Sequence, residues 1–245
     1  MSTHLCIDCG NTRVKAAVIE NSVITARATS DYDHLAPVVD LAARSGAQAA
    51  LMASTTHRST EVAQALADVL HCPVKELDHT TPIPLQIAYR TPHTLGRDRI
   101  ATAVGAWTEF TGCNLLVVDA GTCITFDVVL ADGTLLGGNI APGINMRLQA
   151  MHQHTSRLPL VERDGDVPLV AYDTTTALRC GAVLGAAAEI DGMATRLTSV
   201  LGQLKVMLTG GDAPLLAEHL LIQHVTLADD LLLNGLDTIL DYNLK

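Results

Sequence analysis

The sequence predicts an α/β protein built from two related halves. Two apolar stretches, Leu5–Lys15 and Leu115–Asp127, share one pattern: a strand ends in Asp, Gly follows two positions later, and small hydroxyl or amide residues precede a second apolar run. This pattern predicts a β-hairpin with an acid at its bend. Glycine there permits positive φ and close approach of the backbone to a ligand, and neighbouring amide donors can face phosphate oxygens. We therefore expect one phosphate-binding hairpin in each half.

Length and composition agree with this prediction. The 245 residues are 48% hydrophobic and only 3% aromatic, which indicates a core of Ala, Val, Leu and Ile suited to buried strands and closely packed helices. A chain of this length can form one large domain or two smaller ones. The repeated hairpin favours two halves, residues 1–114 and 115–245.

The first half reads as a three-stranded meander followed by alternating helices and strands. Strands are expected at residues 4–8, 13–19, 22–29, 48–53 and 74–77, and helices at residues 33–44 and 59–70. The second helix opens on Ser59 and stops before Pro73, which cannot continue a helix.

An irregular segment, residues 78–96, contains three prolines and leads into a helix expected at 100–110. Asp98 stands between Arg97 and Arg99 in the first turn of that helix. The helix dipole favours anions at this end. The group could be a binding site or a surface ion pair.

The second half repeats the plan of the first. Strands are expected at residues 115–118, 124–130, 134–138, 204–209 and 225–227, and helices at residues 144–154, 174–201, from 214, and 228–240. A glycine-rich loop is expected at 137–143, and the polar segment 155–172 is a candidate lid. In the long helix, Gly181, Gly185 and Gly192 share one face. Each costs about 1 kcal/mol relative to Ala, so we expect a compensating close approach by a sheet or a partner helix.

Charge, hydropathy and cysteines exclude several classes. The net charge of -10, without a basic cluster, argues against nucleic acid as a partner. The sequence shows no signal-peptide pattern and no uninterrupted apolar run of about 18 residues, so a soluble cytoplasmic protein without membrane contact is expected. The six cysteines are expected to be reduced, and Cys6-x-x-Cys9 lacks a second pair that would complete a metal site.

Two acid-bearing hairpins indicate phosphoryl transfer. That reaction needs positioning, charge neutralisation and an acceptor for the proton of the nucleophile. The hairpin backbones could position phosphates, and Lys15 with a metal could neutralise charge. Asp8, Asp98 and Asp119 are each candidates for the proton acceptor. The sequence contains no G-x-x-x-x-G-K-[ST] motif, which argues against the P-loop class of kinases.

Six motifs, spread over nearly the whole chain, resemble those of type III pantothenate kinases. They are D-x-G-N-T-x-x-K at residues 8–15, P-x-x-x-G-x-D-R at 92–99, D-x-G-T-x-x-T-x-D at 119–127, G-G-x-I-x-P-G at 137–143, T-x-x-A-x-x-x-G at 174–181 and T-G-G-D-A at 209–213. This family belongs to the superfamily of acetate and sugar kinases, heat-shock chaperone ATPases and actin. The resemblance therefore implies two ribonuclease H-like halves with a nucleotide cleft between them, the actin-like ATPase fold.

The resemblance also assigns roles to matching residues. ATP phosphates would be bound by Asp8, Gly10, Asn11, Thr12 and Lys15, with a further contact from Thr122. Pantothenate would be held by Tyr89, Gly96, Arg97, Asp98, Arg99 and Thr174. Asp98 would be the catalytic proton acceptor, and Asp119 would help bind a monovalent cation, potassium or ammonium. Cys123 stands where the family more often has Ala, and Thr174–Thr176 leaves the register of the threonine ambiguous.

The implied reaction is ATP-dependent phosphorylation of pantothenate to 4'-phosphopantothenate, the first step of coenzyme A biosynthesis. ATP would carry a divalent metal, expected to be magnesium. The resemblance implies a homodimer that completes the pantothenate site, and the face around Gly181 and Gly185 is our candidate for part of the interface. Two alternatives stay open: another small-molecule kinase of the superfamily, and a regulatory accessory factor that has kept the fold.

Overall fold

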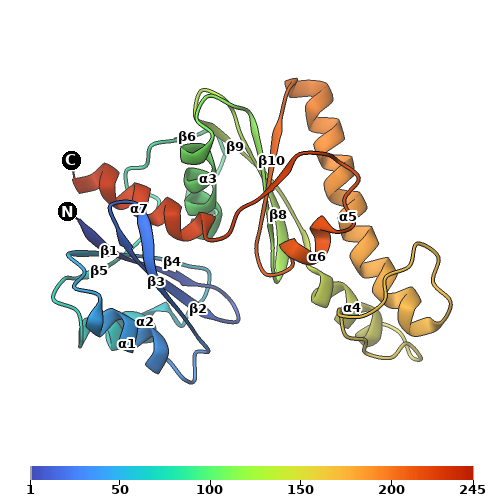
Figure 1. Cartoon of the computed structure of the whole chain (residues 1–245), viewed down its shortest axis with the longest axis horizontal. Coiled ribbons are helices and arrows are strands. Elements are labelled where there is room, and N and C mark those ends of the chain that lie inside the picture. Colours follow the sequence, from blue (N-terminus) through green and yellow to red (C-terminus); the bar gives the residue numbers. More distant parts are fainter. Residues whose placement is uncertain (1, 245) are drawn as a thin grey trace. The chain divides into compact units, whose positions relative to one another are not determined.

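The computed structural model, which describes residues 2–244, is a mixed α/β fold with two sheets (Figure 1). One sheet has five strands in the order β3-β2-β1-β4-β5, and the other has six in the order β11-β10-β7-β8-β9-β6. The chain forms two compact units. Unit 1 comprises Met1–Gly112, Val129–Gly137 and Asp230–Lys245, and unit 2 comprises Cys113–Val128 and Gly138–Asp229.

The five-stranded sheet of unit 1 begins as an antiparallel meander and continues with parallel strands. Its strands are β1 (Thr3–Cys9), β2 (Val14–Glu20), β3 (Val23–Ser30), β4 (Ala49–Ser54) and β5 (Val74–Glu76). β2 pairs antiparallel with β1 and β3, whereas β4 pairs parallel with β1 and β5. The expected three-stranded meander is therefore confirmed.

Two helix pairs cover this sheet, one on each face (Figure 1). The first pair is α1 (Ala36–Arg44) and α2 (Ser59–Ala67), and the second is α3 (Arg97–Glu109) and α7 (Leu231–Leu244). Under α1 and α2 lies a core of alternate strand residues that includes Ile7, Val14 and Met52. Because side chains alternate along a strand, the residues between them face α3 and α7.

The six-stranded sheet carries the second hairpin. Its strands are β6 (Gln86–Ile87), β7 (Leu115–Ala120), β8 (Cys123–Val129), β9 (Thr134–Pro142), β10 (Lys205–Thr209) and β11 (Val225–Leu227). Its neighbouring helices are α4 (Ile144–Gln153), α5 (Thr174–Leu201) and α6 (Ala213–Ala217), and a short 3₁₀ turn, η1 (Pro92–Thr94), precedes α3. α5 has the bounds expected from the sequence. Within residues 2–244, no helix combines the length and apolar character that a membrane span requires.

The glycine-rich segment 137–143 corrects a sequence expectation. It was expected to be a loop, but β9 continues through Pro142, and only Gly143 lies outside it, at the start of α4. Glycine is needed for close packing here. A side chain at Gly138 would fall on the carbonyl oxygen of Phe126, and one at Gly143 would fall on the carbonyl oxygens of Gly121 and Thr122. Glycine inside a strand can mark such a close backbone approach.

Two glycines let α3 and α7 cross with their backbones in contact. A Cβ atom at Gly105 would fall on the carbonyl oxygen of Leu231, and one at Gly235 would fall on that of Ala101. The two helices also make the most extensive packing between any two elements of unit 1. Close approach of helix backbones requires residues without side chains.

A buried polar contact fastens α7 to the central strand. His4 Nδ1 of β1 lies 2.6 Å from Asp237 Oδ1 of α7, and both side chains are almost fully buried. Burial raises the pKa of the Asp237 carboxyl, and the contact with His4 opposes that rise. A buried polar group is costly unless it is hydrogen-bonded, so this contact specifies where α7 docks on the sheet.

We predict that Gly105→Ala will destabilise the protein by about 3 kcal/mol or more, because the methyl group forces two packed helices apart. Urea unfolding followed by circular dichroism measures the change. Gly192→Ala in α5 is the matched control, since no described atom lies within 4 Å of its Cβ position. That variant should be neutral or gain about 0.5–1 kcal/mol. Equal stability of Gly105→Ala and wild type would contradict the proposed backbone contact.

Candidate active site

The β1–β2 hairpin brings two of the candidate residues together. Asp8 and Lys15 are directly opposite each other in the antiparallel register, so their side chains leave the same face of the sheet within reach of each other. Asp8 is half-buried and Lys15 is exposed. Ile7 and Val14 point into the core beneath α1 and α2, which places the Asp8–Lys15 pair on the α3 and α7 side.

The bend of this hairpin exposes Asn11 and Thr12 and is closed by the Gly10 amide, which donates to the Arg13 carbonyl at 3.1 Å. One part of the expectation was wrong: neither Gly10 nor Gly121 has positive φ. A Cβ at Gly10 would sit at ordinary contact distance, 3.4 Å, from the Arg13 carbonyl oxygen, and one at Gly121 would lie 3.9 Å from its nearest neighbour, Asp119 Oδ1. Packing within the chain therefore does not require glycine at either bend.

Asp98 lies in the first turn of α3, two residues after the N-cap Gly96. Its side chain is half-buried, and no described residue gives its Oδ1 atom a hydrogen-bond partner. Burial raises the pKa of the Asp98 carboxyl, and a backbone hydrogen bond from Arg99 and the charge of Arg99 oppose that rise. A side chain at Gly96 would collide with this carboxylate. The site thus holds a partly desolvated carboxylate with one buried oxygen available.

The three arginines between positions 90 and 99 differ in their surroundings. Arg97 donates from Nη1 to the Leu95 carbonyl and from Nη2 to the His93 carbonyl, both at 3.1 Å, and so fixes the η1 turn. Arg99 is buried, and Arg90 is exposed. A guanidinium has five N–H donors, so Arg97 keeps its Nε–H and part of Nη2 for a ligand.

Tyr89 is half-buried and packs over β9. Its ring occupies the space into which a side chain at Gly137 would project, and Gly137 has φ +88°. Glycine is therefore required at this position both for its backbone conformation and for the tyrosine ring. The contact fixes the segment between β6 and η1 that leads to Asp98.

In unit 2, backbone hydrogen bonds bring three of the sequence motifs together. Asp119, one residue before the end of β7, pairs with Thr209 of the parallel strand β10. The Asp212 amide donates to the Ala120 carbonyl at 2.9 Å, and the Gly143 amide donates to the Thr122 carbonyl at 3.1 Å. The second hairpin is thereby tied to the T-G-G-D-A turn and to the start of α4.

The register of the threonines at the start of α5 is partly resolved by its capping box. The Thr176 amide donates to Asp173 Oδ1 at 2.8 Å, and the Thr176 hydroxyl also hydrogen-bonds to Asp173 Oδ1, at 2.8 Å. Thr176 is buried, whereas Thr174 and Thr175 are exposed. Thr176 therefore caps the N-terminus of α5, a role that could not be predicted from the sequence motif.

Sequence reasoning also missed how the segment 155–172 is held. Arg163 forms an ion pair with the buried Asp212 of the T-G-G-D-A turn. Arg179 of α5 donates to the Glu162 and Asp166 carbonyls at 3.0 and 3.3 Å. These arginines anchor the segment that was interpreted as a candidate lid. No periodicity or spacing signals such long-range pairs.

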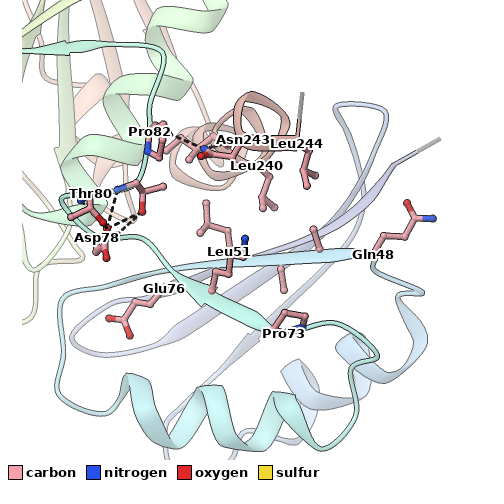
Figure 2. Close-up of a pocket in the computed structure, with 15 residues that line it drawn as sticks. Gln48, Leu51, Pro73, Glu76, Asp78, Thr80, Pro82, Leu240, Asn243 and Leu244 are labelled. Carbon is pink, nitrogen blue, oxygen red and sulfur yellow. Dashed lines mark hydrogen bonds between the residues drawn. The ribbon is translucent and has the colours of Figure 1, made fainter.

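A separate cavity lies in unit 1, between the β4–β5 edge of the sheet and the end of α7 (Figure 2). Its volume is about 590 Å3, and the Asn243 side chain closes one end by donating to the Pro82 carbonyl at 2.8 Å. Leu51, Leu240 and Leu244 are among its apolar lining residues. The candidate site residues named above do not line it, so this cavity is distinct from the candidate active site.

The donors near the hairpins suit a hard cation. Asp8, Asp98 and Asp119 offer carboxylate oxygens, the ligand type that magnesium and potassium take. Within residues 2–244, no group of three or more His, Cys, Asp or Glu side chains is arranged to hold a metal by itself. Each of these carboxylates by itself could supply one or two oxygens to a cation, and the remaining ligands would have to come from other groups. The six cysteines are free thiols.

The fold and the paired acid hairpins define a class of protein. A Baf family protein from Campylobacter jejuni has a similar solved structure, with a TM-score of 0.62, 21% identity and 98% of both chains covered. The activator of 2-hydroxyisocaproyl-CoA dehydratase from Clostridium difficile, solved with ADPNP, gives a TM-score of 0.54 at 13% identity, covering 99% and 97% of the chains. The expected actin-like ATPase fold class is confirmed.

Sequence comparison gives the particular family. The family model described as type III pantothenate kinase matches residues 4–196. Curated type III pantothenate kinases from Bacteroides fragilis and Phocaeicola vulgatus are 39% and 37% identical to this chain, over 98% and 99% of both sequences. The chain belongs to the type III pantothenate kinase family. The family and the kinase class expected from the six motifs are thereby confirmed.

Proposed function

We propose that this chain transfers the γ-phosphoryl group of ATP to the primary hydroxyl of pantothenate, giving 4'-phosphopantothenate in the first step of coenzyme A biosynthesis. The observation that carries the proposal is Asp98: a half-buried carboxylate in the first turn of α3, with one oxygen that no described residue engages. Family membership over nearly the whole chain supports the substrate. Relatives of the same length carry the name of this activity.

The β1–β2 hairpin is the proposed site for the ATP phosphates. The exposed bend at Asn11 and Thr12 offers backbone amides and side-chain donors, and Lys15 stands opposite Asp8 with a positive charge. Gly10 supports this assignment because neither its φ nor its packing requires glycine. Close approach of a phosphate would require it. Thr122 is the proposed contact from the second hairpin.

Asp98 is the proposed proton acceptor. Its carboxylate would accept the proton of the pantothenate hydroxyl as that oxygen attacks the γ-phosphorus, while the bond to the β,γ-bridging oxygen breaks and ADP leaves. Burial raises the pKa of this carboxyl above its ordinary value, which makes the carboxylate a stronger base, although it remains a weak one at neutral pH.

Pantothenate carries a carboxylate, and the proposed partners are the donors that Arg97 keeps after fixing the η1 turn. Tyr89, Gly96 and Arg99 shape the same segment, and Thr174 is the exposed threonine proposed to reach the substrate from α5. A planar, bidentate guanidinium is well suited to a carboxylate.

Two cations complete the proposal. Asp119 would hold a monovalent cation, potassium or ammonium, and a divalent metal such as magnesium would neutralise charge on the nucleotide phosphates. The end of β7 is rigid because the Asp212 amide binds the Ala120 carbonyl. This rigidity keeps the Asp119 carboxylate beside Thr209.

A homodimer is also proposed, with α5 contributing to its interface. The candidate part of the interface is the helix around Gly181 and Gly185, and no described atom outside the helix backbone lies within 4 Å of the Cβ position at Gly181. Gly185 has one neighbour there, Arg147 Nη1 at 3.9 Å. We therefore propose that a second copy of the chain packs closely against these glycines. A cytoplasmic location stays a prediction.

An ATP-dependent phosphorylation assay tests the function. We expect ADP and 4'-phosphopantothenate from ATP and pantothenate with magnesium, and higher turnover in potassium or ammonium than in sodium at equal ionic strength. Turnover that does not depend on the monovalent cation would contradict the role of Asp119. A panel of sugars and acetate, assayed in parallel, tests the activities of other kinases of the superfamily. If no ADP is released from ATP in the presence of pantothenate, the proposal is overturned.

The regulatory alternative has one supporting observation, the transcriptional-activator name of the similar Campylobacter jejuni structure. At 21% identity this likeness extends to the fold alone. The net charge of -10 argues against direct DNA binding. Full turnover with pantothenate would leave regulation as at most a second role.

Asp98→Asn should lower kcat by a factor of about 10² to 10⁴ while ATP affinity is retained, because the amide cannot accept the proton. The raised pKa of Asp98 can be tested by the pH dependence of the wild-type enzyme. Only the deprotonated carboxylate acts as base, so kcat/KM for pantothenate should fall as the pH drops through a pKa above the ordinary aspartate value. Asp132→Asn, in an exposed turn of unit 1, is the control. Near-normal turnover of Asp98→Asn would remove Asp98 as the base.

Gly10→Ala should separate folding from nucleotide binding. The added methyl group fits the fold, so the free energy of unfolding should stay within about 1 kcal/mol of wild type. KM for ATP should rise about tenfold or more, since the methyl group blocks close approach of a phosphate. Steady-state kinetics and urea unfolding measure the two effects, with Gly192→Ala as the glycine control. Unchanged KM for ATP would argue against phosphate binding at this bend.

A further inference from the structure

We propose that Tyr32, outside the six motifs, is a positioning residue that fixes the bend of the β1–β2 hairpin for nucleotide binding. This inference rests on the proposed function only in taking the hairpin as the phosphate site. Tyr32 follows β3 and precedes α1, and its hydroxyl donates a hydrogen bond of 2.5 Å to the Gly10 carbonyl.

The hydrogen bond acts at the residue where the hairpin leaves the sheet. The β1–β2 ladder ends with the pair Cys9 and Val14. Beyond this pair, the Gly10 amide donates to the Arg13 carbonyl, and the Gly10 carbonyl accepts a hydrogen bond from the Tyr32 hydroxyl. Gly10, at the start of the exposed bend, is therefore held through both its N–H and its C=O.

The other end of this contact is rigid. Tyr32 is only 8% exposed, and its ring belongs to the core beneath α1 and α2. On the adjacent side, the guanidinium of Arg58 lies 4.8 Å from the ring centroid, a cation–π contact. Arg58 is in turn held by Asp33 and Glu61, with N–O distances of 3.1 Å to each. The hydroxyl is thus fixed to the packed core.

The hydroxyl is also kept in its donor form. Burial raises the pKa of Tyr32 to about 12, and the nearby Cys9 and Asp8 add to that rise. The phenol therefore stays protonated at neutral pH and donates to Gly10. Phosphoryl transfer depends on groups that are positioned before the ligand binds, and this bond limits the movement of the bend that would carry the phosphates.

Tyr32→Phe tests the positioning role because it keeps the ring and removes only the donor. The affinity for the ATP analogue AMPPNP with magnesium, measured by calorimetry, should fall about 3- to 10-fold, the range expected for one hydrogen bond. KM for ATP should rise by a similar factor, while KM for pantothenate stays within about twofold. Amide hydrogen exchange across residues 10–13 should become faster.

Two control variants separate positioning from general stability. Tyr242→Phe removes the same hydroxyl from a side chain that is 50% exposed on α7, and it should leave AMPPNP affinity unchanged. Val38→Ala weakens the core cluster that contains Tyr32 but keeps the hydrogen bond from Tyr32 to Gly10. It should lower the melting temperature but not AMPPNP affinity. If Val38→Ala weakens AMPPNP binding as much as Tyr32→Phe, the positioning role is overturned.

The positioning role would also be overturned if Tyr32→Phe bound AMPPNP as tightly as the wild-type protein does. Should this variant fail to fold, Arg58→Ala leaves the hydroxyl but removes the cation over the ring, and about a twofold loss of AMPPNP affinity is expected. No loss in Arg58→Ala would then overturn the inference. A wild-type chain that binds AMPPNP but does not phosphorylate pantothenate would refute the proposed function alone.

Discussion

Unit 1 depends on the crossing of α3 and α7. Gly105 and Gly235 remove the side chains that would otherwise separate these helices, so each backbone reaches a carbonyl of the other helix. α7 is docked on β1 by the buried contact between His4 and Asp237. Because α3 is packed against α7, the helix that carries Asp98 lies on the same side of the sheet as the Asp8–Lys15 pair.

Unit 2 is organised by backbone contacts at the carboxyl ends of its parallel strands. The Gly143 and Asp212 amides donate to carbonyls of the β7–β8 hairpin, and Gly210, with φ +95°, would collide with the end of β7 if it had a side chain. Glycine is needed where two turns meet at van der Waals distance. Each motif of this unit therefore supports its neighbours.

Much of this arrangement could be predicted, because many strands are short apolar runs and turn residues such as glycine and proline mark where several elements begin and end. The meander, the second hairpin and α5 were expected at nearly their observed bounds. Errors came from glycine. The segment 137–143 was expected as a loop because glycine is rare in strands, and the crossing at Gly105 was missed because its partner lies far away in the sequence.

The sequence by itself determined the family, most of the secondary structure and the short motifs, because these depend on local patterns of residue type. It could not determine that α7 packs on the first sheet or that the Thr176 side chain caps a helix. It also gave no sign that the Tyr32 hydroxyl reaches Gly10. Such contacts join residues of ordinary type, and only the packing of the folded chain brings them within hydrogen-bonding distance.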